Sequence, residues 1–144
     1  MRVTPGKLVR ITQTPTVLGY TYIEHSPILP PGLWYSYVGY STIEVPAGEV
    51  WKTFGVYFTT HHNHFVTALA ILCLAIKNDQ VYGYTGGTVV YPSALPIAGS
   101  IWVPLSELVL TAGTYDFSTR YLITFGRPNW STFTARVMFE RHRA

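Results

Sequence analysis

Residues 50–91 read VWKTFGVYFTTHHNHFVTALAILCLAIKNDQVYGYTGGTVVY, and the centre of this stretch, Phe65–Ile76, has no charged residue and one hydroxyl group, on Thr67. A membrane span needs about 20 apolar residues, so this shorter run is predicted to lie in the core. In an extended strand, one face carries Phe65, Thr67, Leu69, Ile71, Cys73 and Ala75, and the other carries Val66, Ala68, Ala70, Leu72, Leu74 and Ile76. Because both faces are apolar, the strand needs cover from the chain's own core on one side and from something else, such as another subunit, on the other.

A helix is the alternative for this run, because Ala and Leu favour helices and a short apolar run does not fix its own period. The residues that follow favour the strand. Asn78 and Asp79 tolerate positive φ angles, as the centre of a tight hairpin requires, and Gln80–Tyr84 can form the return strand. We therefore predict a β hairpin that turns at Asn78-Asp79.

The composition favours a protein that is covered by partners. The 144 residues fit one domain, of which 48% are hydrophobic, 15% aromatic and only 12% charged. The charged fraction is about half the quarter that is usual in soluble domains. So few charges predict a chain that buries surface against copies of itself or against a scaffold. The alternative is an aromatic-rich monomeric β domain, since Tyr is also common on ordinary strands.

The net charge of +3 is unevenly distributed. Residues 1–10 carry +3 and residues 120–144 carry +4, whereas residues 11–119 carry −4. Basic ends on an acidic body predict docking onto an acidic partner or nucleic acid, unless the terminal arginines are merely solvated or pair with carboxylates of the body. The single cysteine, Cys73, lies between two leucines and is predicted to be a small buried hydrophobic residue. Residues 1–6 do not open a signal peptide, which predicts synthesis in the cytosol.

Turn residues divide the chain into about eight or nine strands without an amphipathic helix, a pattern typical of an antiparallel β-sandwich or single jelly roll. Pro92–Gly99 is predicted to be a loop, Gly86-Gly87 to break or kink a strand, and Gly55 to mark a bulge or a close backbone approach. Residues 1–33 are predicted to form an N-terminal strand and an extended proline-containing arm, and residues 34–144 the sandwich, within one domain. The expected strands are Lys7–Gln13, Val17–Ile23, Trp34–Val45, Glu49–Thr60, Phe65–Ile76, Gln80–Tyr91, Ile101–Pro104, Tyr115–Phe125 and Phe133–Phe139.

Two short segments have a similar form. VPAGEVWK, at 45–52, and LVLTAGTY, at 108–115, each join an apolar strand end to an aromatic strand start through an Ala-Gly turn. With these corners, residues 40–140 resemble the small single-jelly-roll virion proteins of bacteriophages, which are capsid, capsid-decoration or head-fibre subunits. The resemblance implies homotrimers or pseudo-hexamers, arms that latch onto neighbours, no catalysis, no cofactor, and a place in the virion after assembly in the host cytoplasm.

From these observations we expect a structural subunit that assembles with itself, as a trimer, and with other shell proteins. No membrane contact is expected, and nucleic acid only through the basic termini. The expected contacts between subunits are Phe65, Leu72, Leu74, Ile76, Trp51 and Tyr57. The expected contacts with the particle are Arg2, Lys7, Arg10, Pro30, Pro31, Arg141 and Arg143.

Catalytic and metal sites find little support in the sequence. His61, His62 and His64 could bind a divalent ion, and His62-Asn63-His64 is similar to the His-x-His pair of cupin barrels. No carboxylate lies between Phe65 and Leu74 to complete such a site, so no metal is predicted. The histidines are then ordinary loop residues, or they meet their copies around an oligomer axis. With no Gly-x-Ser-x-Gly elbow and no phosphate-binding loop, we do not expect an enzyme.

A carbohydrate-binding, lectin-like module is the alternative function, because jelly rolls also serve as lectin domains. Three exposed coplanar rings along one groove would favour sugar binding, whereas rings buried in a subunit contact would favour assembly. The candidate rings are Trp34, Tyr35, Tyr37, Tyr40, Trp51, Trp102 and Trp130.

Overall fold

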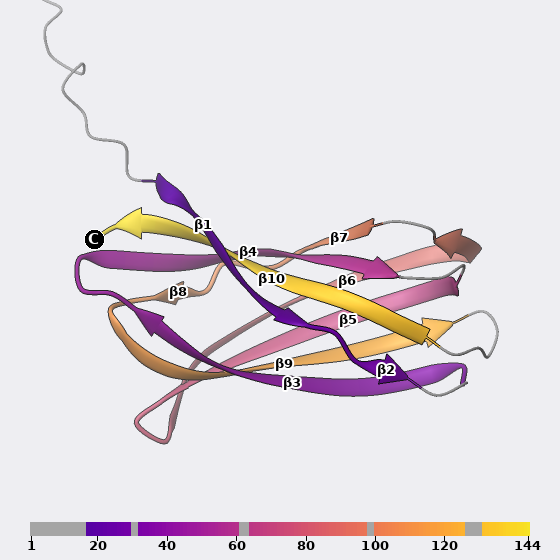
Figure 1. Cartoon of the computed structure of the whole chain (residues 1–144), viewed down its shortest axis with the longest axis horizontal. Coiled ribbons are helices and arrows are strands. Elements are labelled where there is room, and N and C mark those ends of the chain that lie inside the picture. The colour runs from indigo at the N-terminus through magenta and orange to yellow at the C-terminus, as the bar shows by residue number, and fades with distance from the viewer. Residues whose placement is uncertain (1–16, 30–31, 61–63, 98–99, 126–130) are drawn as a thin grey trace, which may run out of the picture.

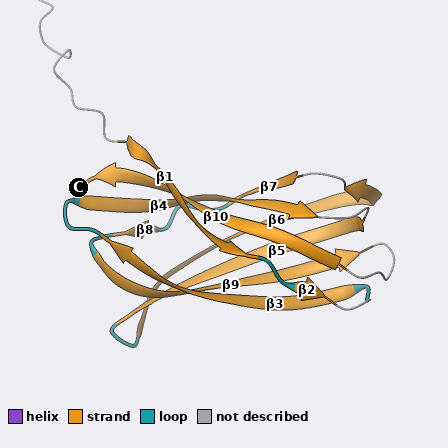
Figure 2. Ribbon diagram, in the orientation of Figure 1, coloured by secondary structure: helices purple, strands orange, loops and turns teal. Residues whose placement is uncertain are grey.

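The computed structural model is all β and describes residues 17–29, 32–60, 64–97, 100–125 and 131–144. Strands make up most of this part of the chain and loops are short (Figure 2). Nowhere in these ranges is there a helix suited to crossing a membrane. The strands are β1 (Val17–His25), β2 (Ile28–Leu29), β3 (Trp34–Val45), β4 (Glu49–Thr60), β5 (His64–Lys77), β6 (Gln80–Ile97), β7 (Ser100–Pro104), β8 (Val109–Leu110), β9 (Gly113–Phe125) and β10 (Ser131–Arg143).

The strands form two antiparallel sheets that pack as a sandwich (Figure 1). Sheet I has the order β1-β10-β4-β7, with β2 on β10 and β8 on β4, and sheet II has the order β3-β9-β5-β6. The eight long strands pair first with last: β1 with β10, β3 with β9, β4 with β7 and β5 with β6. This is the pairing of one long hairpin rolled into two sheets, which is a jelly roll, so the predicted fold class is confirmed.

The predicted central hairpin is also confirmed. Lys77 pairs with Gln80, and the two residues between them, Asn78 and Asp79, have φ angles of 53° and 62°. Two central residues with positive φ define the type I′ turn, whose twist matches that of the flanking strands. The strand prediction for Phe65–Ile76 therefore holds against the helical alternative.

One prediction about β6 was wrong, because the strand extends to Ile97 where a loop was expected from Pro92. The strand also continues through Gly86-Gly87, which excludes a break there. Its prolines are tolerated because β6 is an edge strand of sheet II, where one side of the backbone needs no hydrogen-bond partner. The glycines permit a close crossing, since a Cβ on Gly87 would overlap the carbonyl of Pro104.

The N-terminal part of the described chain belongs to the sandwich. β1 pairs with β10 from Val17 to His25, and β2 pairs with Ser131 and Thr132 of the same strand. The expected strand Lys7–Gln13 lies outside the described residues. Within the described residues, β1 is the first strand of the roll.

The two sheets enclose an aromatic core. Phe58 of β4 stacks on Phe133 of β10 at 4.5 Å between ring centroids, and Tyr121 of β9 meets Phe133 edge to face at 5.4 Å. These three rings are almost fully buried. The Phe58–Phe133 contact lies within sheet I, whereas the Tyr121–Phe133 contact joins the two sheets and helps to fix how they lie on one another.

Candidate functional site

The outer face of sheet II is apolar along its centre. On β5, Leu69 and Ile71 point into the core, whereas Leu72 is 51% exposed and Leu74 is half-buried. From Ala68 onward the alternation expected of this strand is present, and its second apolar face lies on the surface of the monomer. Val66 was placed on the wrong face, because a register shift between Val66 and Ala68 brings it into the core. The register places Val38, Tyr40, Leu122, Tyr84, Val81 and Val90 on the same face, around Ala68, Ala70, Leu72, Leu74 and Ile76.

Several of these neighbours are more exposed than Leu72, among them Tyr84 at 71% and Val90 at 73%. A groove of about 440 Å³ crosses β9 between Tyr40 and Ile76. A contiguous apolar face of this kind is uncommon on a protein that works as a monomer.

Three charged residues lie on the outward positions of sheet II that the structure describes, Glu44, Asp116 and Arg120. Asp116 and Arg120 are four positions apart on β9, which corresponds to about 13 Å along a strand. This separation is too long for an ion pair within one chain. Arg120 instead donates a hydrogen bond to Ser36 Oγ at 3.2 Å.

The outer face of sheet I has a different chemistry, because aromatic rings cross it from one edge to the other. Phe54 lies between Tyr20, at 5.5 Å, and Trp102, at 5.2 Å, and Trp102 also contacts Tyr57 at 6.1 Å. Next to this row, Arg136 lies over the ring of Tyr22 at 4.8 Å. We call Tyr20, Tyr22, Phe54, Tyr57 and Trp102 the aromatic strip.

A bulge in β4 lets Phe54 join the strip. Opposite Met138 and Phe139 of β10, the register skips from Gly55 to Thr53, so Phe54 is the extra residue. The bulge that Gly55 predicted is therefore confirmed at this position. The indole of Trp102 lies over Gly55, where a Cβ would overlap it.

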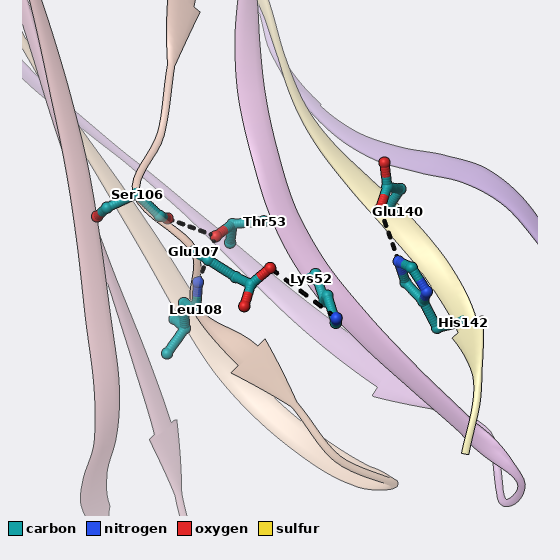
Figure 3. A network of polar contacts seen from close by, with 7 residues as sticks. All are labelled: Lys52, Thr53, Ser106, Glu107, Leu108, Glu140 and His142. Atoms are coloured by element: carbon teal, nitrogen blue, oxygen red, sulfur yellow. Dashed lines mark hydrogen bonds and ion pairs between the residues drawn. The ribbon is translucent and has the colours of Figure 1, made fainter. Parts of the chain in front are cut away.

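Paired charges border the strip on both sides. On one side, Arg136 Nε donates to Glu24 Oε1 at 2.8 Å. On the other side, Lys52 is 3.9 Å from Glu107, and His142 is 2.6 Å from Glu140 (Figure 3).

Backbone and hydroxyl contacts hold Glu107 in place. Thr53 Oγ1 donates to the carbonyl of Ser106 at 2.8 Å and accepts from the amide of Leu108 at 2.7 Å, so the segment that carries Glu107 is tied to β4 (Figure 3). Thr85 of β6 donates to the same carbonyl of Ser106. This border of the strip therefore belongs to the rigid part of the sandwich.

Two titratable groups are enclosed between the sheets. Cys73 is fully buried, as the sequence predicted, and burial raises the pKa of its thiol to about 12. His25 is also buried, with Nδ1 2.9 Å from the hydroxyl of Tyr121 and Nε2 3.3 Å from Ser41 Oγ. Burial lowers the pKa of His25 below its usual 6.5. Neither group is open to a ligand.

The structure divides the residues expected between subunits. Leu72, Leu74 and Ile76 lie together on the outer face of sheet II, whereas Tyr57 lies on the opposite outer face, in the aromatic strip. Trp51 is half-buried, packs on Phe139 and donates to Glu49 at 3.0 Å. The side chain of Phe65 is outside what the structure describes.

The residues expected to dock on a particle are also found in different settings. Arg141 makes two hydrogen bonds to Glu49, of 2.9 and 3.1 Å, and these lower the pKa of that carboxylate. Arg143 is exposed at the end of β10. The C-terminus is tied down, because the amide of Ala144 donates to the carbonyl of Gly48 at 2.9 Å. Arg2, Lys7, Arg10, Pro30 and Pro31 lie outside the described residues.

Most of the histidine cluster lies outside the described residues. His61 and His62 lie outside the described residues, and for His64 only the backbone, at the start of β5, is described. Within the described ranges, no three His, Cys, Asp or Glu side chains gather as a metal site would require.

Of the candidate sugar-binding rings, Trp34 and Tyr40 are exposed on sheet II, and Trp102 belongs to the aromatic strip on sheet I. Tyr35 and Tyr37 pack against the core, and Trp130 is not described. Sequence reasoning missed Tyr20, Tyr22 and Phe54. Their one local signal is the alternation of Tyr20 and Tyr22 in β1.

Comparisons with known proteins do not add a relative: neither a protein-family model nor a curated protein sequence matches this chain.

Proposed function

We propose that this protein is a non-enzymatic structural subunit that assembles with itself through the outer face of sheet II, as a capsid or capsid-decoration subunit of a virion. One observation carries the assembly part of the proposal. Leu72 lies in the middle of an almost uninterrupted apolar strand and is half exposed in the monomer. A protein that worked alone would gain solubility from a polar residue there.

The size of the face is adequate for a stable contact. Strands lie about 4.8 Å apart and rise about 3.3 Å per residue, so four strands of about ten residues present a projected footprint of roughly 500 Å². The accessible area of such a corrugated surface is larger than its projection. It is therefore of the same order as the about 800 Å² that each partner buries in a typical stable complex.

The charges on this face favour a second copy of the chain as the partner. Arg120 and Asp116 flank Ser118 at equal distances along β9. If two copies meet about a two-fold axis at Ser118, with their β9 strands antiparallel, each Arg120 faces Asp116 of the other copy. Self-complementarity of this kind is what an isologous contact requires. A trimer, as the resemblance implies, would need a further contact of another type.

The virion part of the proposal rests on the jelly-roll topology together with the resemblance of the two Ala-Gly corners. A fold alone does not define a function. The corners are adjacent in space, since Val45 pairs with Gly113, and Gly48 and Gly113 both have positive φ angles, of 85° and 145°. In this proposal the exposed Arg143 remains available to other shell proteins, whereas Arg141 is held by Glu49.

Light scattering after size-exclusion chromatography tests the assembly. The wild type is expected to run as an integral multiple of 16.2 kDa. Leu72→Glu places a charge in the apolar face and should give monomers, whereas Tyr57→Glu alters the opposite face and should leave the mass unchanged. Because both side chains are about half exposed, both variants should fold. A monomeric wild type would refute self-assembly, and loss of the oligomer in Tyr57→Glu alone would place the contact on sheet I.

Electron microscopy of the wild-type oligomer tests the virion part separately. Closed rings or shells at high protein concentration would support a shell subunit. Isolated small oligomers that never form larger closed assemblies would retain self-association and refute shell formation.

A further inference from the structure

We propose that the outer face of sheet I binds a single chain of a neutral polysaccharide along the aromatic strip. The inference is independent of assembly, because the strip and the apolar face lie on opposite outer sides of the sandwich. It rests on four features of the strip: fixed rings, paired charges, a small groove and tilted ring planes.

The rings of the strip are held in place before any ligand arrives. Each of Tyr20, Phe54, Tyr57 and Trp102 contacts at least one other ring of the strip, and the indole of Trp102 is seated on Gly55. All four are 38–55% exposed, so each offers part of its ring to solvent. Rings that are already ordered lose little conformational entropy when a ligand binds.

The chemistry of the strip fits a sugar. The face of an aromatic ring carries partial negative charge and attracts the polarised C–H groups on one side of a pyranose ring. Sugar hydroxyls need donors and acceptors at the edge of that stack, and the pairs Glu24–Arg136 and Lys52–Glu107 supply both. Because each of these pairs is internally neutralised, a neutral glycan fits better than an acidic one.

A groove beside the strip has the size for one sugar unit. It encloses about 230 Å³ and is lined by Tyr57, Thr59, Thr134 and Arg136. Pockets for drug-sized ligands start at about 300 Å³, so this groove suits a smaller group. A chain that lies on the strip can place one residue in the groove.

The tilt of the rings selects the form of the glycan. Ring planes differ by 30° between Tyr20 and Phe54, by 64° between Phe54 and Trp102, and by 62° between Tyr57 and Trp102. The strip is therefore not the coplanar set of rings expected above for a sugar platform, an arrangement that would suit the flat surface of a crystalline polysaccharide. Successive residues of a soluble chain rotate about their linkages and can follow the turned rings.

Affinity electrophoresis in native gels tests the proposal. The gels contain one neutral soluble polysaccharide each: mixed-linkage β-glucan, galactomannan, xyloglucan or pullulan. We expect at least one of them to retard the wild type. Trp102→Ala should weaken that retardation by about tenfold or more, since one stacked ring is lost. Gly55→Ala should weaken it too, because the new methyl group displaces the indole from its seat.

Trp34→Ala is the matched control, because it removes an exposed tryptophan from the outer face of sheet II. This variant should be retarded as strongly as the wild type. Circular dichroism and the oligomer mass must match the wild type for Trp102→Ala, Gly55→Ala and Trp34→Ala. Leu72→Glu should keep the retardation even as a monomer. Failure of every polysaccharide to retard the wild type would overturn the proposal. Equal retardation of Trp102→Ala and wild type would overturn it as well, as would a loss confined to Trp34→Ala.

Discussion

The two outer faces of the sandwich both belong to antiparallel sheets, but they present different side chains to a partner. Sheet II presents Ala, Leu, Ile and Val side chains along its centre, with the exposed rings of Tyr40 and Tyr84 beside them, and its Arg120 and Asp116 are too far apart to neutralise each other. Sheet I presents a row of aromatic rings in contact with one another, and the charges beside them are already paired, as in Glu24–Arg136. Opposite charges that cannot pair within one chain favour a complementary copy, whereas charges that are already paired need none.

The difference has a simple physical origin. The inner faces of both sheets must fill the same core, so packing constrains the residues on both in the same way. The outer faces carry no such constraint, and their composition reflects what covers them. The outer faces are therefore the regions of the described sandwich that carry the most information about its partners.

The largest expected effect separates the inner and outer faces of β5. Ile71→Ala leaves a cavity in the core and should lower the free energy of unfolding by about 2–5 kcal/mol. The adjacent Leu72→Ala removes a half-exposed side chain and should cost under about 1 kcal/mol at low protein concentration. Urea unfolding followed by circular dichroism measures both.

Protein concentration sharpens this contrast. If Leu72 lies in a contact between copies, the loss from Leu72→Ala should grow as the protein concentration rises, because assembly then contributes to the stability of the wild type. The loss from Ile71→Ala should stay constant. A concentration-independent loss for Leu72→Ala would place that side chain outside any contact between copies.

The next effect tests the two-fold contact by exchanging its charges. Arg120→Asp would set Asp residues of two copies against each other, and should raise the dissociation constant of the oligomer by about thirtyfold or more, equivalent to about 2 kcal/mol. Adding Asp116→Arg restores opposite charges across the axis and should recover most of the affinity. Sedimentation velocity over a dilution series measures the three constants. An exchange that fails to recover affinity would contradict the pairing about Ser118.

The sequence predicted the fold well wherever the signal was local. The turn at Asn78-Asp79, the alternation of β5 and the bulge at Gly55 each depend on a few consecutive residues, and each is present. The end of β6 was missed because its prolines suggest a loop unless the strand is known to lie at an edge. Edge position is set by pairing between distant segments, which a single sequence does not show.

The candidate sites show the same limit more clearly. Leu72 and Tyr57 were assigned to one interface because both lie on apolar strands near each other in the chain, and the structure puts them on opposite faces. The aromatic strip joins β1, β4 and β7, and the extra residue in β4 changes the phase so that Phe54 and Tyr57 share a face. A bulge shifts alternation by one position, which reverses the predicted side of every residue beyond it.

The smallest expected effect concerns the interior, where the two sheets meet at His25. This side chain of β1 contacts Tyr121 and Ser41 of sheet II, and its ring lies over Gly39, so no acidic group compensates a positive charge there. Burial lowers its pKa, which means that the unfolded chain binds a proton more readily than the folded one. As the pH falls below 6.5, the free energy of unfolding should therefore decrease, by at most about 1.4 kcal/mol per pH unit for one proton.

Urea unfolding between pH 7.5 and pH 5 should show this decrease in the free energy of unfolding for the wild type. The decrease should be smaller in His25→Gln, whatever the stability of that variant at pH 7.5. Equal pH slopes in the wild type and His25→Gln would show that protonation of His25 does not cause the loss of stability at low pH.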